Sequence, residues 1–113
     1  MRDLSNTEWS AFAKAVKQLQ SGPSPTPYDA IVKIHVDNQA AVHGYPLFFP
    51  WHRYYVLVFE QHLQAIDPSI MVPYWDWGYD SQAPEASPIL SARYFGGNGQ
   101  GSEKKRQRQT QHV

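Results

Sequence analysis

The chain has 113 residues, of which ten are Lys or Arg and ten are Asp or Glu, so its formal net charge is zero. This balance disfavours a general nucleic-acid binder and an acidic solvating chain, and an apolar fraction of 42% excludes a wholly disordered protein. The longest apolar run, residues 54–59, is far shorter than the roughly 20 residues that cross a membrane, and the absence of cysteine excludes disulfides and thiolate metal sites.

The first predicted helix begins at a capping box. Ser5 can accept a hydrogen bond from a backbone N–H of the first turn, while Glu8 can accept one from the backbone of Ser5. Apolar residues then recur at helical spacing from Trp9 to Leu19, and a Ser-Gly-Pro sequence at 21–23 ends the helix.

A second, shorter helix is predicted to begin at Pro27, because proline suits the first turn of a helix. The apolar face of this helix includes Ile31 and ends with His35. One glycine and two prolines then predict an irregular segment over residues 37–50.

The longest predicted helix runs from Pro50 to about Ile66, and His52 begins its apolar stripe. The short aromatic segment 71–79 is predicted to be a loop or a brief strand. A glycine-rich stretch then leads to a tail with four basic groups and one acidic group. We therefore expect a mostly α-helical domain over residues 1–101 and a disordered basic tail over residues 102–113.

Three histidines stand out, because two of them lie on apolar helix faces and the third lies on the segment between them. A single histidine on such a face is more often a core residue with satisfied ring nitrogens than a metal ligand. The prolines at 46 and 50 allow the segment to fold back, so that His35, His43 and His52 could converge on one point. Three neutral imidazoles in an aromatic pocket favour zinc or copper.

The residues around these histidines resemble a known family. The sequence HGYPLFFPWHRYY at 43–55, followed by Phe59 and Glu60, resembles the first copper motif of tyrosinases. VPYWDW at 72–77 resembles a second segment of the family, and residues 28–35 lie where the family has its first ligand. The resemblance covers about residues 4–101 and is strongest to short fungal tyrosinase-like proteins.

This resemblance implies a partial helical bundle of the tyrosinase and hemocyanin type, with long loops. In the family, two copper ions, each bound by three histidines, react with dioxygen and oxidise phenols to ortho-quinones. The residues that match the ligands of the first copper are His35, His43 and His52. The resemblance thus implies one copper ion at most on this chain, with a phenolic small molecule and dioxygen as partners, and neither nucleic acid nor a membrane.

The second copper motif of the family is not found in this sequence, which has only His62 and His112 besides the three matched histidines. We therefore expect a chain that corresponds to the first-copper half of a tyrosinase, is inactive alone and self-associates through exposed apolar surface. Two other hypotheses stay open. One is a protein that binds a single zinc or copper ion through the same histidines, and the other is a non-catalytic interaction module.

Three further residues are expected to support the site. Arg53 and Asp76 lie in the two most family-like segments and are predicted to form a structural ion pair. Glu60 is a candidate for a hydrogen bond to a ligand imidazole, although a purely structural role is equally compatible with the sequence. His62 is expected to be a surface histidine. We expect no signal peptide, because no basic and then apolar leader follows Met1, and the cellular compartment stays open.

Overall fold

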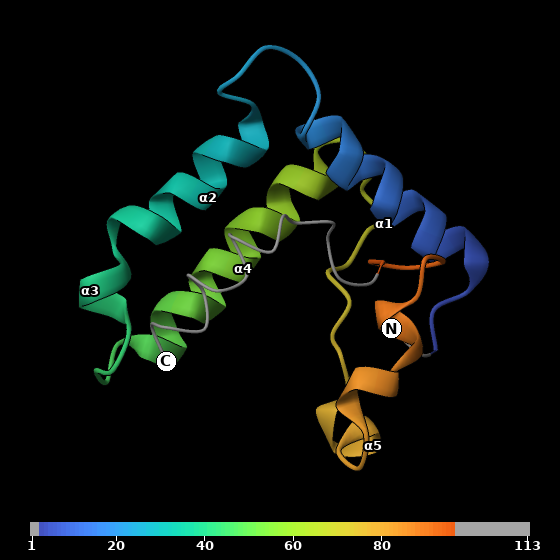
Figure 1. The fold of residues 1–113 in the computed structure, drawn as a ribbon. Coiled ribbons are helices and arrows are strands. Elements are labelled where there is room, and N and C mark those ends of the chain that lie inside the picture. The colour runs from blue at the N-terminus through green and yellow to red at the C-terminus, as the bar shows by residue number, and fades with distance from the viewer. Residues whose placement is uncertain (1–2, 97–113) are drawn as a thin grey trace, which may run out of the picture. The chain divides into compact units, whose positions relative to one another are not determined.

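The computed structural model describes residues 3–96, and the predicted basic tail lies outside this range. The described chain forms two units, residues 3–74 and residues 75–96, and each is considered by itself. All regular elements within residues 3–96 are helices (Figure 1), which agrees with the expected fold class. None of the described helices is long and apolar enough to cross a membrane.

Helix α1 (Asn6–Leu19) confirms the first predicted capping box. The backbone N–H of Glu8 donates to the Ser5 hydroxyl at 3.2 Å, and the backbone N–H of Ser5 donates to the Glu8 carboxylate at 2.8 Å. These bonds satisfy two N–H groups that have no partner inside the helix. The helix buries one face, formed by Phe12, Ala15 and Leu19.

Helix α2 (Pro27–Asp37) begins at a second capping box. The backbone N–H of Thr26 donates to the Asp29 carboxylate at 2.7 Å, and the backbone N–H of Asp29 donates to the Thr26 hydroxyl at 3.2 Å. Pro27 predicted the start of this helix correctly, but the capping box was not predicted. The box fixes the start of the helix that carries His35.

The segment 37–50 is more ordered than predicted. It contains the short helix α3 (Gln39–Val42), and helix α4 (Phe48–Gln64) begins two residues before Pro50. The prediction was wrong at this point because a proline in the first turn of a helix removes an N–H that would have no partner inside the helix anyway. Between α3 and α4 the chain turns at Gly44, whose φ of +76° favours glycine.

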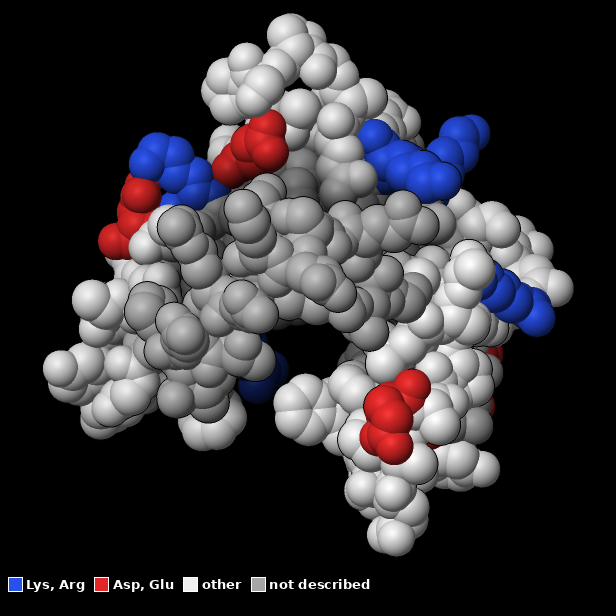
Figure 2. All heavy atoms as spheres, viewed as in Figure 1, with Lys and Arg blue, Asp and Glu red and all other residues white. Residues whose placement is uncertain are grey.

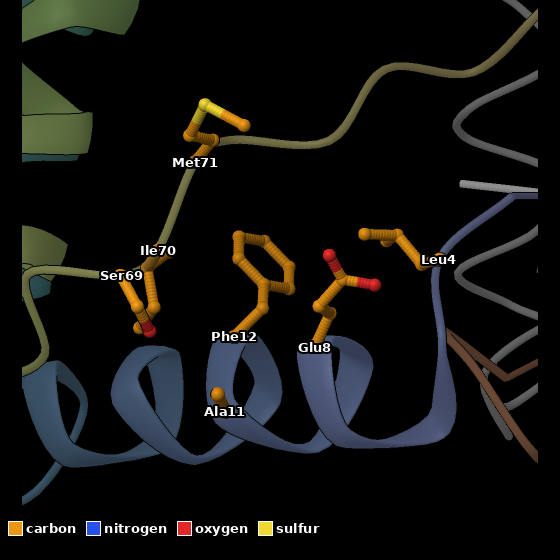
Figure 3. Close-up of a pocket in the computed structure, with 7 residues that line it drawn as sticks. All are labelled: Leu4, Glu8, Ala11, Phe12, Ser69, Ile70 and Met71. Atoms are coloured by element: carbon orange, nitrogen blue, oxygen red, sulfur yellow. The ribbon is translucent and has the colours of Figure 1, made fainter.

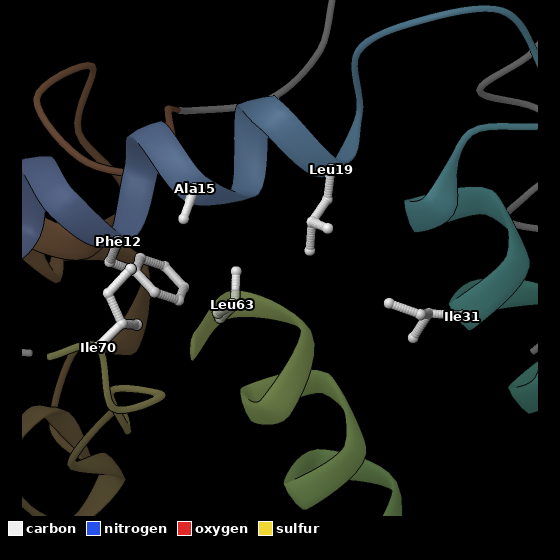
Figure 4. Packing of buried hydrophobic residues seen from close by; sticks show 6 residues of the cluster. All are labelled: Phe12, Ala15, Leu19, Ile31, Leu63 and Ile70. Atoms are coloured by element: carbon white, nitrogen blue, oxygen red, sulfur yellow. The ribbon is translucent and has the colours of Figure 1, made fainter. Parts of the chain in front are cut away.

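The core of the unit 3–74 surrounds Leu63, whose side chain is 0% exposed. Figure 4 shows this cluster, in which α1, α2 and α4 and the segment after α4 contribute Phe12, Ala15, Leu19, Ile31, Leu63 and Ile70. Leu63 lies near the C-terminal end of α4, so the core holds this end of the helix. The N-terminal end of α4, which carries His52, lies beside α3 (Figure 1).

The unit 75–96 begins with a short helix and continues as turns. Residues 70–76 have no regular structure, as predicted, but helix α5 (Trp77–Asp80) then begins inside the segment expected to be a loop or strand. The Asp76 carboxylate accepts a hydrogen bond from the backbone N–H of Tyr79 at 3.1 Å. Aspartate is a favoured N-cap residue, which explains why a helix begins at this position.

Asp80 organises the chain after α5. Its Oδ2 atom accepts a hydrogen bond from Trp75 Nε1 at 2.6 Å and one from the Ser87 hydroxyl at 2.5 Å. Two short 3-10 turns, Pro84–Ala86 and Pro88–Leu90, follow. Asp80 therefore connects Trp75, at the start of this unit, with Ser87, which lies between the two 3-10 turns.

Candidate metal centre

Three consecutive elements of the unit 3–74 each carry one of the three histidines. His35 lies in the last turn of α2, His43 directly follows α3, and His52 lies on α4. Because α4 begins at Phe48, His52 is in the second turn of the helix rather than in the first. All three side chains are half-buried. We call these residues the histidine trio.

The ring nitrogens of the histidine trio converge, as the sequence predicted. The Nε2 atom of His35 lies 3.3 Å from Nε2 of His43 and 3.2 Å from Nε2 of His52. One nitrogen from each ring lies within 4.8 Å of the other two. Metal–nitrogen bonds of about 2.0 Å place nitrogens of neighbouring ligands about 3.3–3.5 Å apart in tetrahedral or trigonal geometry. The two His35 distances therefore match those of imidazoles on one metal ion.

Hydrogen bonds to the backbone fix the protonation pattern of two rings. Nδ1 of His43 lies 2.9 Å from the carbonyl oxygen of Gln39, and Nδ1 of His52 lies 2.7 Å from that of Phe48. A carbonyl oxygen only accepts hydrogen bonds, so each Nδ1 carries the proton and each neutral ring presents a bare lone pair at Nε2. These two carbonyl partners were not predicted, although each lies four residues before its histidine, which is the spacing of one helical turn.

This pattern makes the histidine trio suited to a cation. Nε2 of His43 and of His52 can act only as acceptors in neutral rings, and both face Nε2 of His35. A proton on His35 can make one good hydrogen bond, whereas a metal ion can accept all three lone pairs. The donor set of three neutral imidazoles suits zinc and copper in particular.

Aromatic side chains surround the trio. The rings of Phe48 and His52 have centroids 4.3 Å apart. The ring of His35 is stacked on Trp51 and Tyr55, with centroid distances of 5.8 Å and 5.4 Å. Apolar neighbours limit access of water to a metal site and so influence its chemistry. The sequence predicted an aromatic pocket around the three histidines, and these ring contacts agree with that prediction.

The phenol of Tyr55 reaches across to α2. Its hydroxyl donates a hydrogen bond to the carbonyl oxygen of Ile31 at 3.0 Å. Burial raises the pKa of the Tyr55 phenol above its usual value, with a smaller contribution from Tyr28. The hydroxyl therefore stays protonated and able to donate at neutral pH.

His62 is separate from the trio, although it lies on the same helix. Its Nδ1 atom lies 2.8 Å from the carbonyl oxygen of Val58, so its ring has the same kind of backbone bond as His52. Within residues 3–96, however, the group of potential metal ligands is limited to the histidine trio. His62 is exposed, as expected.

The supporting residues have other contacts in the structure. The Glu60 carboxylate accepts a hydrogen bond from the backbone N–H of Val72 at 2.8 Å. This bond ties the segment that follows α4 back to that helix. Asp76 caps α5, and Arg53 is exposed on α4. Arg53 and Asp76 belong to different units, and their ion pair stays a prediction, as does a bond from Glu60 to a ligand.

A small pocket of about 60 Å³ lies beside the first half of α1. Figure 3 shows Phe12 and Glu8 on the helix, facing Ile70 and Met71 on the neighbouring segment. Hydrogen bonds of the α1 capping box hold the Glu8 carboxylate and lower its pKa. The pocket is far smaller than the roughly 300–1,000 Å³ of ordinary ligand sites, so we assign no ligand to it.

Large apolar side chains remain exposed around the start of α4. They are Tyr45, Leu47, Phe48, Phe49, Tyr54, Val56 and Leu57, which we call the 45–57 surface. The sequence predicted that the aromatic residues of this region could not all be buried, and the structure confirms it. On the face drawn in Figure 2, the charged side chains of the described residues lie in small scattered groups.

Comparison with known proteins gives a consistent result. Residues 25–113 match the family described as the common central domain of tyrosinase. The chain is 43% identical over 104 residues to a tyrosinase of Streptomyces glaucescens, covering 85% of this chain and 36% of that protein. It is 37% identical over 105 residues to a tyrosinase-like protein of the fungus Diaporthe leptostromiformis, covering 87% of this chain and 28% of that protein.

A relative of a different type also matches. The chain is 36% identical over 85 residues to hemocyanin 1 of Megathura crenulata, covering 66% of this chain and 2% of that protein. The chain spans about a third of the length of the tyrosinases that it matches. The histidine trio lies within the matched residues.

Proposed function

Because the chain belongs to the tyrosinase family, we propose that His35, His43 and His52 bind one copper ion as the first half of a two-copper oxidase centre. The observation that carries this proposal is the convergence of three Nε2 atoms, two of them on rings whose protons are held on Nδ1 by backbone carbonyls. Such a set binds a metal ion without a change of tautomer at His43 or His52.

Copper supplies the redox chemistry when it is bound, and the family reaction is the oxidation of phenols to ortho-quinones by dioxygen. The chain itself contributes three neutral ligands, the backbone bonds that orient them, and an aromatic surrounding that limits hydration. Phe48 lies against both His43 and His52, with ring centroids 5.7 Å and 4.3 Å away. A phenol ring approaching the site would meet the apolar side chain of Phe48.

The complete reaction requires more than these residues. The family centre has a second copper ion with three further histidines, whereas among the described residues one group of side chains, the histidine trio, could hold a metal ion. We therefore propose that the 113-residue chain binds one copper ion but does not oxidise phenols alone. In a complete centre, the 45–57 surface would lie against the part of the domain that carries the second copper site.

Copper stoichiometry tests the proposal. The purified chain should bind one copper ion, measured by titration followed by metal analysis after removal of excess metal. His52→Ala should lose this ion, because two imidazoles bind far more weakly than three. His62→Ala is the matched control, since His62 lies on the same helix and has the same backbone bond but lies outside the trio.

Four outcomes would contradict the proposal. Equal losses from both variants would indicate adventitious binding to surface histidines. Retention of zinc in place of copper would support a mononuclear zinc protein, and a folded chain that binds neither metal would support a non-catalytic module. Oxidation of a catechol by the monomeric chain would show that a second copper site is present.

A further inference from the structure

We infer that Tyr55 is a positioning residue that holds the His35 ring in its metal-binding orientation. This inference rests on the proposed metal site and adds a residue that contacts a ligand without itself being one. His35 differs from the other two ligands in the way its ring is held, and Tyr55 makes two contacts that contribute to this difference.

The first contact ties the helices of two ligands together. The Tyr55 hydroxyl donates to the carbonyl oxygen of Ile31 at 3.0 Å. Ile31 lies four residues before His35 on α2, so its carbonyl belongs to the helical turn from which the His35 side chain extends. On α4, Tyr55 lies three residues after His52, and residues at this spacing share a face of a helix. One side chain therefore connects the turn of His35 with the face of His52.

The second contact is made by the ring. His35 and Tyr55 are stacked, with centroids 5.4 Å apart and an interplanar angle of 28°. Trp51 contacts both rings, since its own ring lies 5.1 Å from that of Tyr55 at an angle of 14° and 5.8 Å from that of His35 at an angle of 28°. A flat aromatic surface beside the imidazole opposes rotation of the His35 ring about its Cβ–Cγ bond, because rotation would drive the ring edge into its neighbours.

The other ligands do not depend on such stacking. His43 and His52 are oriented by hydrogen bonds from Nδ1 to carbonyl oxygens in their own segments. Within residues 3–96, no such bond is made by Nδ1 of His35. Partners of this kind usually set the ring orientation of a metal-binding histidine, and their loss typically costs 10–100-fold in metal affinity. Tyr55 takes the place of that partner for His35.

Two variants separate the two contacts. Tyr55→Phe removes the hydroxyl and keeps the ring, and Tyr55→Leu removes both. Tyr54→Phe is the matched control, because Tyr54 is the adjacent tyrosine on the same helix and is 67% exposed. The affinity for Cu²⁺ is measured by competition with a chelator of known affinity, and the electron paramagnetic resonance spectrum of the bound Cu²⁺ reports the ligand geometry.

We expect Tyr55→Phe to weaken Cu²⁺ binding about 10-fold and Tyr55→Leu to weaken it towards 100-fold, with Tyr54→Phe unchanged. The stoichiometry should stay at one ion, and the resonance spectrum of Tyr55→Leu should change, because His35 is no longer held. A variant that only destabilised the fold would show a lower unfolding midpoint with an unchanged spectrum of the bound ion, which would contradict the inference. If Tyr55→Leu fails to fold, the affinity of Tyr55→Phe decides.

The failures of the two proposals are distinguishable. If the unmodified chain binds no stoichiometric copper, the proposed metal site is wrong. If it binds one ion and both Tyr55 variants bind within twofold of it with an unchanged spectrum, the metal site stands and the positioning role of Tyr55 is wrong.

Discussion

Phe49 lies in the first turn of α4 with 80% of its surface exposed, which makes it the most exposed large apolar residue of the 45–57 surface. Burying a whole phenylalanine side chain contributes about 1.5–3 kcal/mol. Four-fifths of this range is about 2 kcal/mol, which corresponds to about a 30-fold change in a dissociation constant. If two copies of the chain associate through the 45–57 surface and bury Phe49, Phe49→Gln should weaken the association by about this factor.

Sedimentation velocity over a range of protein concentrations measures this association. Met71→Gln is the matched control, because Met71 is 76% exposed but lies on the segment after α4, outside the 45–57 surface. We expect the unmodified chain and Met71→Gln to associate at similar concentrations, and Phe49→Gln to remain monomeric at concentrations about 30 times higher. Equal association by all three proteins, or equal loss in the two variants, would refute the role of this surface.

Three further predictions concern stability. Leu63→Ala should lower the free energy of unfolding by about 3 kcal/mol, because Leu63 is fully buried. Leu57→Ala, at a 46% exposed site on the same helix, should lower it far less. Urea denaturation of the two variants compares these losses. Hydrogen bonds from Thr26 lower the pKa of Asp29 below its usual 3.8, so this carboxylate stabilises the fold above that pH and the contribution is lost as the pH falls through the lowered value. Asp29→Asn should therefore flatten the acid limb of the unfolding free energy, and an unchanged pH dependence would contradict the role of the box. Copper at 100 times its dissociation constant should raise the free energy of unfolding by about 2.7 kcal/mol, and a chelator should reverse this gain. An unfolding midpoint that copper leaves unchanged would exclude binding to the folded state.

The sequence was most informative where local rules decide the structure. Ser5 and Glu8 placed the start of α1 correctly, because a capping box involves residues within one turn. Pro27 placed the start of α2 in the same way. Pro50 misled the prediction for α4, since a proline is compatible with any position in the first turn and so does not fix which residue begins the helix.

One part of the candidate site could likewise be predicted from the sequence, and another part could not. The predicted convergence of His35, His43 and His52 is present in the structure, because their spacing around the prolines at 46 and 50 and their surrounding sequence were informative. The contacts of Tyr55 could not be predicted, since its hydroxyl bonds to a residue 24 positions away and its ring meets another helix. Such contacts depend on how α2 and α4 pack, which no local pattern in the sequence specifies.

The number of imidazole ligands on the bound copper tests the proposed half-centre most directly. X-ray absorption at the copper edge counts these ligands and measures their distances in the loaded chain. We predict three imidazole nitrogens at about 2.0 Å, falling to two or fewer in any ion that remains in His52→Ala. A shell made mainly of oxygen, or the same imidazole count in both proteins, would contradict the assignment of the histidine trio as the copper site.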